Sequence, residues 1–327
     1  MLRRLALSAL LLAGITLLPA RFAPQRTNAA GMTSVSFSLN WIKNVEFAGL
    51  WVAQQKGWWK QAGLDVSAKA WDYNSDPTVL VGAGKYTFGF QDGASIIIAR
   101  SKGVPVKAVW ASNQLSPFAF ITMPNSGIKT VKDFRGKRIG YQGHEGYVLQ
   151  EMLNDVGMSL KDVKPQVVGF DPTLLLAGKV DAYLAFLTNE PIELAQKDHV
   201  KVNVIPASKY GYSFYSDVLF TTDSTIASNP ALVRKVVSVM DRGWRYALAH
   251  PAEVAKLVVP KLDNQDTVAQ QTAEMKAMAP MAEVHGVTVG SMTSAKWQDG
   301  INLLYRYKQI TTRPKASDVF TTQFLAK

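Results

Sequence analysis

The stretch Ser38-Leu39-Asn40-Trp41-Ile42-Lys43-Asn44-Val45-Glu46-Phe47 decides how the rest of the chain is organised. Just before it, apolar residues alternate with serines, which predicts a half-buried strand. Asn44 is typical of a helix N-cap, and Glu46 is favourable in a first helical turn. Asn40 and Trp41 therefore lie at the carboxyl end of a strand, where open α/β sheets bind ligands. An amide beside an indole suits a planar, polar small molecule.

The first thirty residues have the composition of an export signal. Arg3 and Arg4 precede the apolar run 5–18, and small residues follow at 28–30. A basic head, an apolar middle and a small-residue cleavage site indicate a secretory signal peptide. An apolar run of about 14 residues is short for a membrane anchor. We therefore expect residues 1–30 to be removed and the mature protein to lie in the periplasm.

The composition is that of a folded globular protein with room for two domains. The chain has 327 residues, of which 47% are hydrophobic and 19% charged. Cysteine is absent, so the chain can form neither a disulfide nor a thiolate metal site, and it has no cysteine for a lipid anchor. The net charge of +11 is scattered, without the basic run and interleaved aromatics that nucleic-acid binding needs.

Strand and helix signals alternate along the chain. The order is β-α-β-α-β between residues 34 and 110, and a similar alternation runs from residue 137 to residue 186. This pattern predicts an α/β fold with mostly parallel sheets flanked by helices. After residue 228 the sequence predicts mainly helices.

An internal echo relates the two halves. The repeated motif is Asp-Pro-Thr, then Ala-Gly-Lys and a strand, and it occurs at residues 76–85 and 171–179. The strand after each copy ends in polar residues, Gln91 in one and Asn189 with Glu190 in the other. If the echo is structural, the polar strand ends of two similar lobes face one cleft. Chance similarity is the alternative, because Asp-Pro helix starts are common.

Motifs for catalysis or cofactor binding are not found in the sequence. The four histidines, His144, His199, His250 and His285, lack the spacing of metal ligands on one helix. There is no P-loop, no dinucleotide-binding Gly-x-Gly-x-x-Gly after a strand, and no Gly-x-Ser-x-Gly nucleophile turn. The sequence therefore favours a protein without a cofactor or metal, and nothing in it argues for an enzyme.

The turn after Tyr141 bears on the charge of a ligand. Gly143 and Gly146 could present backbone N–H groups to an anion. Glu145 lies between them, where its carboxylate would meet those groups and repel a sulfonate or phosphate. The turn therefore favours a neutral or cationic ligand, unless Glu145 is only a surface residue at a helix start.

Other candidate contacts lie at predicted strand ends. Trp41 and Trp71 are placed to stack on a ligand, whereas the tryptophans of residues 51–59 suit packing of the first helix. Asn189 and Glu190 have two interpretations. They could cap and begin a helix, or Glu190 could bind a ring N–H or an exocyclic amine.

Several segments, in order, resemble the thiamine-pyrimidine-precursor branch of the type II periplasmic binding proteins. They are Asn40-Trp41 with Asn44, Phe47–Ala53, Lys56–Lys60, Gly63–Val66, Gly84–Asp92, Arg100–Val104, Phe134–Gly140 and Gly178–Asp181. The resemblance covers about residues 34–220. It is specific to the superfamily, because sulfonate, nitrate, pyrimidine and riboflavin binders share this frame.

The resemblance implies two α/β lobes that close over a ligand about a hinge. Residues 118–123 and 218–222 fit the two crossing strands, which places residues 31–120 and 223–327 in one lobe and residues 121–222 in the other. It also implies a monomer that hands its ligand to the permease of an ABC importer in the inner membrane.

The resemblance further implies how a heterocycle would be held. The Asn-Trp pair of the pyrimidine-binding relatives carries onto Asn40 and Trp41, with Trp41 stacking on the ring. Tyr147 or Tyr183 would cover the other ring face. The ring edges would be hydrogen-bonded by polar side chains at the strand ends, namely Asn40, Gln91, Asn189 and Glu190.

The expected ligand is a thiamine-pyrimidine precursor of the hydroxymethylpyrimidine or formylaminopyrimidine type. Riboflavin is the alternative, and an alkylsulfonate or nitrate is a third. The fungal pyrimidine synthases of the family use a cysteine-rich iron motif, which this chain lacks. A synthase-like enzyme is therefore disfavoured relative to a transport protein.

Overall fold

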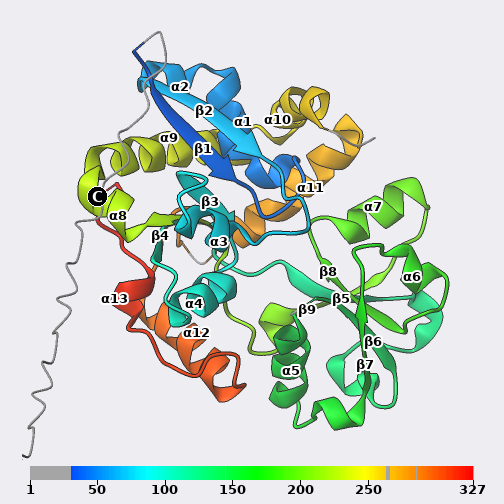
Figure 1. The fold of residues 1–327 in the computed structure, drawn as a ribbon. Helices are drawn as coiled ribbons and strands as arrows, with labels where there is room; N and C mark the ends of the chain where they lie inside the picture. Colours follow the sequence, from blue (N-terminus) through cyan, green and yellow to red (C-terminus); the bar gives the residue numbers. More distant parts are fainter. Residues whose placement is uncertain (1–30, 144, 263–265, 285, 327) are drawn as a thin grey trace, which may run out of the picture.

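Two lobes, each built on a five-stranded sheet, make up the protein (Figure 1). The computed structural model describes residues 31–143, 145–262, 266–284 and 286–326, so the expected signal peptide lies outside the described residues. The first sheet has the order β2 (Leu64–Lys69), β1 (Thr33–Ser38), β3 (Phe88–Gln91), β10 (Ser216–Thr222), β4 (Val106–Asn113). The second has the order β7 (Lys164–Val168), β6 (Arg138–Gln142), β8 (Ala182–Phe186), β5 (Phe118–Thr122), β9 (Asn203–Pro206).

Both sheets are parallel except for one strand, as the alternation of strand and helix signals predicts. In the first sheet β1 is parallel to β2 and β3, while β10 is antiparallel to β3 and β4. In the second, β6 is parallel to β7 and β8, while β5 is antiparallel to β8 and β9. The two sheets thus share one topology, and each antiparallel strand is the first that the chain forms after entering that lobe from the other.

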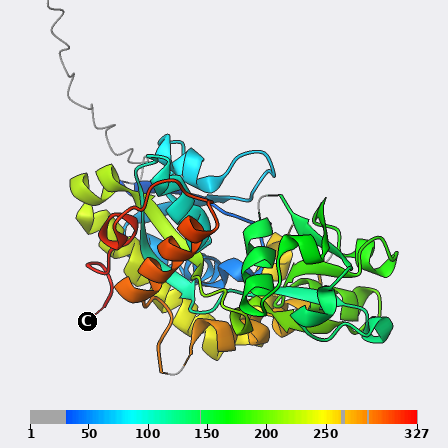
Figure 2. The ribbon, with the colours of Figure 1, turned by 90° about the horizontal axis from the view of Figure 1, so that it is seen from below.

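The chain passes between the lobes at residues 114–117 and 210–215 (Figure 2). Residues 118–122 form β5 within the second sheet, and residues 216–222 form β10 within the first. The two strands expected at the crossings are therefore the first strands that the chain forms after each passage. Each strand pairs with a neighbour on both sides, which fixes it inside one sheet.

Helices cover both faces of each sheet. In the first lobe one face carries α1 (Ala48–Gln55), α2 (Trp58–Gln61), α9 (Pro230–Ala249), α10 (Pro251–Val258) and α11 (Val268–Ala282), and the other carries α3 (Pro77–Gly82), α4 (Gly93–Ser101), α12 (Ser294–Arg306) and α13 (Ala316–Val319). A short α8 (Asp223–Ser228) follows β10. In the second lobe α5 (Gly146–Asp155) packs on one face, and α6 (Thr173–Leu176) and α7 (Glu190–Lys197) on the other. Within the described ranges no helix is both long and apolar enough to cross a bilayer.

The echo predicted from the sequence is structural. The Oδ1 atom of Asp76 accepts hydrogen bonds from the backbone N and the hydroxyl of Thr78, at 2.7 and 2.6 Å. Asp171 accepts the same two bonds from Thr173, at 2.9 and 2.6 Å. These turns open α3 and α6, which lead into β3 and β8, the middle strands of the two sheets. The same motif therefore occupies equivalent places in both lobes.

Candidate functional site

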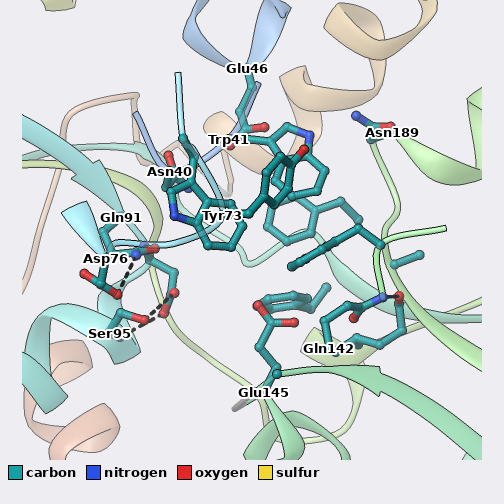
Figure 3. Close-up of a pocket in the computed structure, with 18 of the residues that line it drawn as sticks. Asn40, Trp41, Glu46, Tyr73, Asp76, Gln91, Ser95, Gln142, Glu145 and Asn189 are labelled. Carbon is teal, nitrogen blue, oxygen red and sulfur yellow. Dashed lines mark hydrogen bonds between the residues drawn. The ribbon is translucent and has the colours of Figure 1, made fainter. Parts of the chain in front are cut away.

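A cavity of about 420 Å³ lies between the lobes, where the carboxyl ends of β1, β3, β6 and β8 converge (Figure 3). Figure 3 shows Asn40, Trp41 and Glu46 on one side of the cavity and Gln142 and Glu145 on the other. Strand ends meet there because parallel strands all point to the same edge of their sheet. The volume lies in the range of pockets that enclose a small organic molecule.

Most of the residues expected to contact a ligand line this cavity, namely Asn40, Trp41, Trp71, Gln91, Glu145, Asn189 and Glu190. Tyr147 and Tyr183, expected to cover a ring face, do not. Tyr147 is buried in the core and stacks on Tyr212, with ring centroids 6.1 Å apart. Tyr183 packs on the far face of its sheet and donates its hydroxyl to the Gly169 carbonyl at 2.9 Å. Successive residues of a strand face opposite ways, so Leu184 reaches the cavity and Tyr183 does not.

Four aromatic rings form a cluster at one end of the cavity. Trp41, Trp71 and Tyr73 belong to the first lobe, in the turns after β1 and β2. Phe170 comes from the second lobe, in the turn after β7. Its ring centroid lies 5.0 Å from that of Trp41, 5.6 Å from that of Trp71 and 5.7 Å from that of Tyr73. The cluster is therefore shared by the two lobes. Phe170 meets Trp41 and Trp71 edge to face, and it meets Tyr73 at a tilt.

The turn that carries Asn40 and Trp41 is held by its neighbours. Asn44 caps the 3₁₀ helix η1 (Val45–Phe47) as predicted, accepting a hydrogen bond from the Glu46 backbone at 3.0 Å. The Trp71 backbone N donates to the Trp41 carbonyl at 3.1 Å. The turns after β1 and β2 are thus tied together, which orients their aromatic side chains toward the second lobe.

All the charged side chains among the described residues that line the cavity are carboxyl groups, since no lysine or arginine is among them. The carboxyl side chains are Glu46, Asp76, Asp92, Glu145 and Glu190. Burial raises the pKa of Glu145 well above its usual range and that of Glu190 to about 7. The charged form of a buried carboxyl is disfavoured by desolvation, so these groups favour the protonated state or a ligand that donates to them. Within the described ranges no three such groups are arranged to hold a metal ion.

The structure corrects two interpretations of the local sequence, those of the Glu145 and Asn189 side chains. Glu145 precedes α5 but makes no capping hydrogen bond, so its carboxyl does not occupy the N–H groups of its own turn. Asn189 stands at the N-cap of α7 as expected, but its side chain does not cap the helix either. Glu190 accepts a hydrogen bond from the Phe186 backbone at 2.8 Å, which folds it back over the end of β8. Asn189 and Glu145 therefore line the cavity without capping their helices.

The sequence interpretation missed two important lining residues. Glu46, which the sequence indicates only as a favourable first-turn residue, is buried and lines the cavity. Phe170, which the sequence does not single out, lies two residues after the end of β7 and lines the cavity too. The echo contained the signal for Phe170. It directly precedes the second Asp-Pro-Thr motif, as the segment with Trp71 and Tyr73 precedes the first.

Two similar α/β lobes with a ligand-sized cavity between them define the fold of the periplasmic binding proteins. The periplasmic aliphatic sulphonate binding protein SsuA from Escherichia coli has this fold, with a TM-score of 0.71, 13% identity and coverage of 90% of this chain and 94% of that one. The alkanesulfonate-binding protein SsuA from Xanthomonas axonopodis pv. citri bound to MOPS gives a TM-score of 0.69, with 16% identity over 88% and 98% of the two chains. At such identities the likeness concerns the fold.

The chain belongs to the family described as NMT1/THI5 like, whose model matches residues 44–254. The riboflavin-binding protein RibY of Chloroflexus aurantiacus is 33% identical over 244 residues, covering 72% of this chain and 68% of the relative. The 4-amino-5-hydroxymethyl-2-methylpyrimidine phosphate synthase of Aspergillus parasiticus is 30% identical over 234 residues, covering 67% and 68% of the two chains. The family thus contains both a binding protein and a synthase among the relatives of this chain.

Proposed function

We propose that the chain is a periplasmic solute-binding protein that captures a flat, nitrogen-rich heterocycle, foremost a flavin such as riboflavin, and delivers it to the permease of an ABC importer. The aromatic cluster between the lobes carries this proposal. A planar ring would insert between Trp41 and Phe170, whose rings meet edge to face across the two lobes. Phe170 would then cover the second ring face, the part expected of Tyr147 or Tyr183. The mature protein would act as a monomer after removal of residues 1–30.

The charge of the lining supports a ligand that is not an anion. An alkylsulfonate or nitrate needs N–H donors and a cation, whereas the cavity presents carboxyl groups from both lobes. Like charges brought together in a partly desolvated site repel strongly. Hydroxyl and N–H donors on a neutral ligand would instead satisfy these carboxyl oxygens. Riboflavin offers both kinds of donor, on its ribityl chain and on its ring.

The size of the cavity favours a flavin over a single pyrimidine ring. Pockets bury most of the surface of the ligand they bind, and a volume of about 420 Å³ suits a molecule of drug size. A lone substituted pyrimidine would leave much of it to water. The 33% identity with a riboflavin-binding protein points the same way. The order of preference expected from the sequence is therefore reversed.

A thiamine-pyrimidine precursor is the second candidate. The relatedness to a pyrimidine phosphate synthase supports it, as does Glu190, whose carboxyl could accept from an exocyclic amine. A synthase activity itself has less support, because the chain has no cysteine for an iron motif of the fungal type. Turnover of a bound pyrimidine would distinguish an enzyme from a carrier.

Ligand identification on the purified mature protein tests the proposal. Protein isolated without denaturation is unfolded, and the released small molecules are identified by mass spectrometry. In parallel, flavin and tryptophan fluorescence are followed during titration with riboflavin, hydroxymethylpyrimidine and an alkanesulfonate. We expect a dissociation constant below about 1 μM for riboflavin and little binding of the sulfonate. Tight binding of the sulfonate alone, or of none of the three, would contradict the proposal.

A further inference from the structure

Asp217 does not line the cavity, yet it contacts two residues that do. Its Oδ1 atom accepts a long hydrogen bond, 3.4 Å, from the amide nitrogen of Asn40. Together with burial, its charge raises the pKa of the neighbouring Glu46 carboxyl. On its other side, Oδ2 accepts a short bond of 2.6 Å from the amide nitrogen of Asn113. The buried carboxyl of Asp217 thus interacts with three segments. They are the turn after β1 that carries Asn40, the start of η1 with Glu46, and the end of β4 with Asn113.

The backbone around Asp217 is built to hold this side chain. Asp217 is the second residue of β10, directly after the crossing segment 210–215, and it is 1% exposed. Its φ angle is +50°, in the left-handed region that residues other than glycine seldom adopt. Asn113 is the last residue of β4, just before the other crossing. Unusual backbone of this kind persists where the surrounding contacts impose it, and it is common at ligand sites.

Several buried oxygens near Asp217 have no hydrogen-bond partner among the described residues, and two of them belong to residues that line the cavity. These two are Oδ1 of Asn40 and Oε1 of Glu46. Both residues line the cavity, and Glu46 is more than nine-tenths buried. A buried acceptor left without a donor is unfavourable. Because the Asn40 nitrogen is turned toward Asp217, only its oxygen remains to meet a donor.

We propose that Asp217 is a positioning residue, which orients the Asn40 amide and the Glu46 carboxyl so that the site selects ligands with N–H or O–H donors at this end of the cavity. The inference rests on the proposed function. It adds a rule of recognition, namely that a ligand without those donors loses affinity although its ring still stacks. It also predicts that a residue outside the cavity controls this selectivity.

The pair of carboxyls makes the orientation sensitive to pH. Burial raises the pKa of Asp217 to about 6 and that of Glu46 well above its usual range. Asp92 also raises the pKa of Asp217, and Glu190 and Glu274 raise that of Glu46. While it is ionised, Asp217 is an acceptor for the Asn40 amide. Protonation of Asp217, as pH falls through about 6, turns it into a donor that competes with the ligand for the amide oxygen.

The test compares the wild type with Asp217→Asn and with a matched control, Ser112→Ala. Asparagine tolerates a positive φ, so the first variant changes the carboxyl and little of the backbone. Ser112 Oγ donates to the backbone carbonyl of Asp217 at 3.1 Å, so the control perturbs the same site without touching its carboxyl. Each protein is titrated with riboflavin, with 3-methylriboflavin, which lacks the ring N–H, and with lumiflavin, which lacks the ribityl hydroxyls.

We expect Asp217→Asn to weaken riboflavin binding about tenfold and Ser112→Ala to leave it within about twofold. The loss should shrink to about twofold for at least one analogue, because that analogue lacks the donor that would bind the acceptors oriented by Asp217. Wild-type affinity for riboflavin should fall from pH 7 to pH 5 more steeply than that of the variant.

Equal losses of affinity for all three ligands in Asp217→Asn, or an unchanged affinity, would overturn the inference. If the variant does not fold, wild-type protein that binds all three flavins equally well would overturn it too. Failure of the wild type to bind any flavin would instead refute the proposed function.

Discussion

Phe170 of the second lobe meets Trp41 of the first edge to face, with ring centroids 5.0 Å apart and planes at 60°. The two side chains lie about 130 residues apart in sequence and come from turns that follow strands of different sheets. Contact between them requires the lobes to be close together. We therefore expect the two rings to contact a planar ligand from both lobes and to come together when the lobes close around it.

Replacing Trp41 by alanine should weaken ligand binding much more than replacing Trp58. Trp41 lines the cavity, whereas Trp58 packs against Tyr246 and under the guanidinium of Arg242 on the first lobe. Loss of a stacking ring costs on the order of 1–3 kcal/mol, or tenfold and more in the dissociation constant. Flavin fluorescence titration of both variants measures this. Equal losses in the two would show that Trp41 acts only through folding.

Phe170→Ala should raise the dissociation constant about tenfold, chiefly through faster ligand release. The ring reaches Trp41 and Trp71 of the other lobe, so its loss removes an aromatic surface that would cover the bound ligand from the second lobe. Val167→Ala is a matched control, because Val167 is an exposed apolar residue on the neighbouring strand β7. Stopped-flow displacement measures both release rates. Similar rates for the two variants would exclude Phe170 from the closed site.

An ion pair between the lobes should contribute to closure. Lys197 Nζ, at the end of α7, lies 3.0 Å from Asp266 Oδ1 in the first lobe, where the carboxyl is almost fully buried. Asp266 also accepts from Gln271, whose Oε1 atom accepts from the Val45 backbone N at 2.9 Å. The ion pair is therefore connected through Gln271 to the start of η1, next to the turn that carries Asn40 and Trp41. Salt should weaken the ion pair.

Lys197→Met should accelerate ligand release several-fold and reduce its dependence on salt concentration, since a partly exposed pair contributes about 1 kcal/mol. Arg135→Met is the control, because its partner Asp162 lies in the same lobe. Release rates measured between 50 mM and 500 mM NaCl decide the point. Salt dependence that survives in Lys197→Met would assign it to other charges.

Glu274 should make stability depend on pH. It is buried in α11 and accepts from the amides of Gln270 and Gln271 at 2.9 Å each. Burial raises its pKa from 4.5 to about 8. The folded state therefore holds a proton that the unfolded state has lost, so this contribution is full below about pH 4.5 and disappears as pH rises through about 8.

Glu274→Gln removes this titration. Relative to the wild type it should gain on the order of 2–4 kcal/mol in unfolding free energy between pH 5 and pH 8.5, seen as a melting temperature that falls less steeply with pH. Glu283→Gln, an exposed position after the same helix, serves as control. Parallel pH profiles for Glu274→Gln and the wild type would show that Glu274 is ionised in the folded protein at neutral pH.

The sequence predicted what local chemistry decides. The capping role of Asn44, the two Asp-Pro-Thr turns and the strand-end position of Trp41 depend on neighbours within a few residues, and the structure has all of them. The places of β5 and β10 within the two sheets depend on partners far away in the chain, which local sequence does not reveal. Asp217 could not be found for the same reason, since Asn40 and Asn113 approach it from about 177 and 104 residues away. Such contacts require the fold first.

The contact between α1 and α9 should not tolerate an added side chain at Gly243. A Cβ atom on Gly243 of α9 would lie 2.1 Å from the carbonyl oxygen of Gly49 in α1, where backbone atoms cannot move aside. Gly243→Ala should therefore lower the unfolding free energy by about 2–4 kcal/mol, although alanine favours the helix by about 1 kcal/mol.

Gly169→Ala is the control for this substitution, since a Cβ atom there meets nothing within 4 Å. It should leave stability unchanged or slightly raised, because alanine restricts the unfolded chain. Urea denaturation of the mature protein measures both variants. Because the α1–α9 contact lies behind the first sheet, Gly243→Ala protein that remains folded should keep its affinity for the ligand. Lost affinity with unchanged stability would place this contact in the closing movement instead of the core.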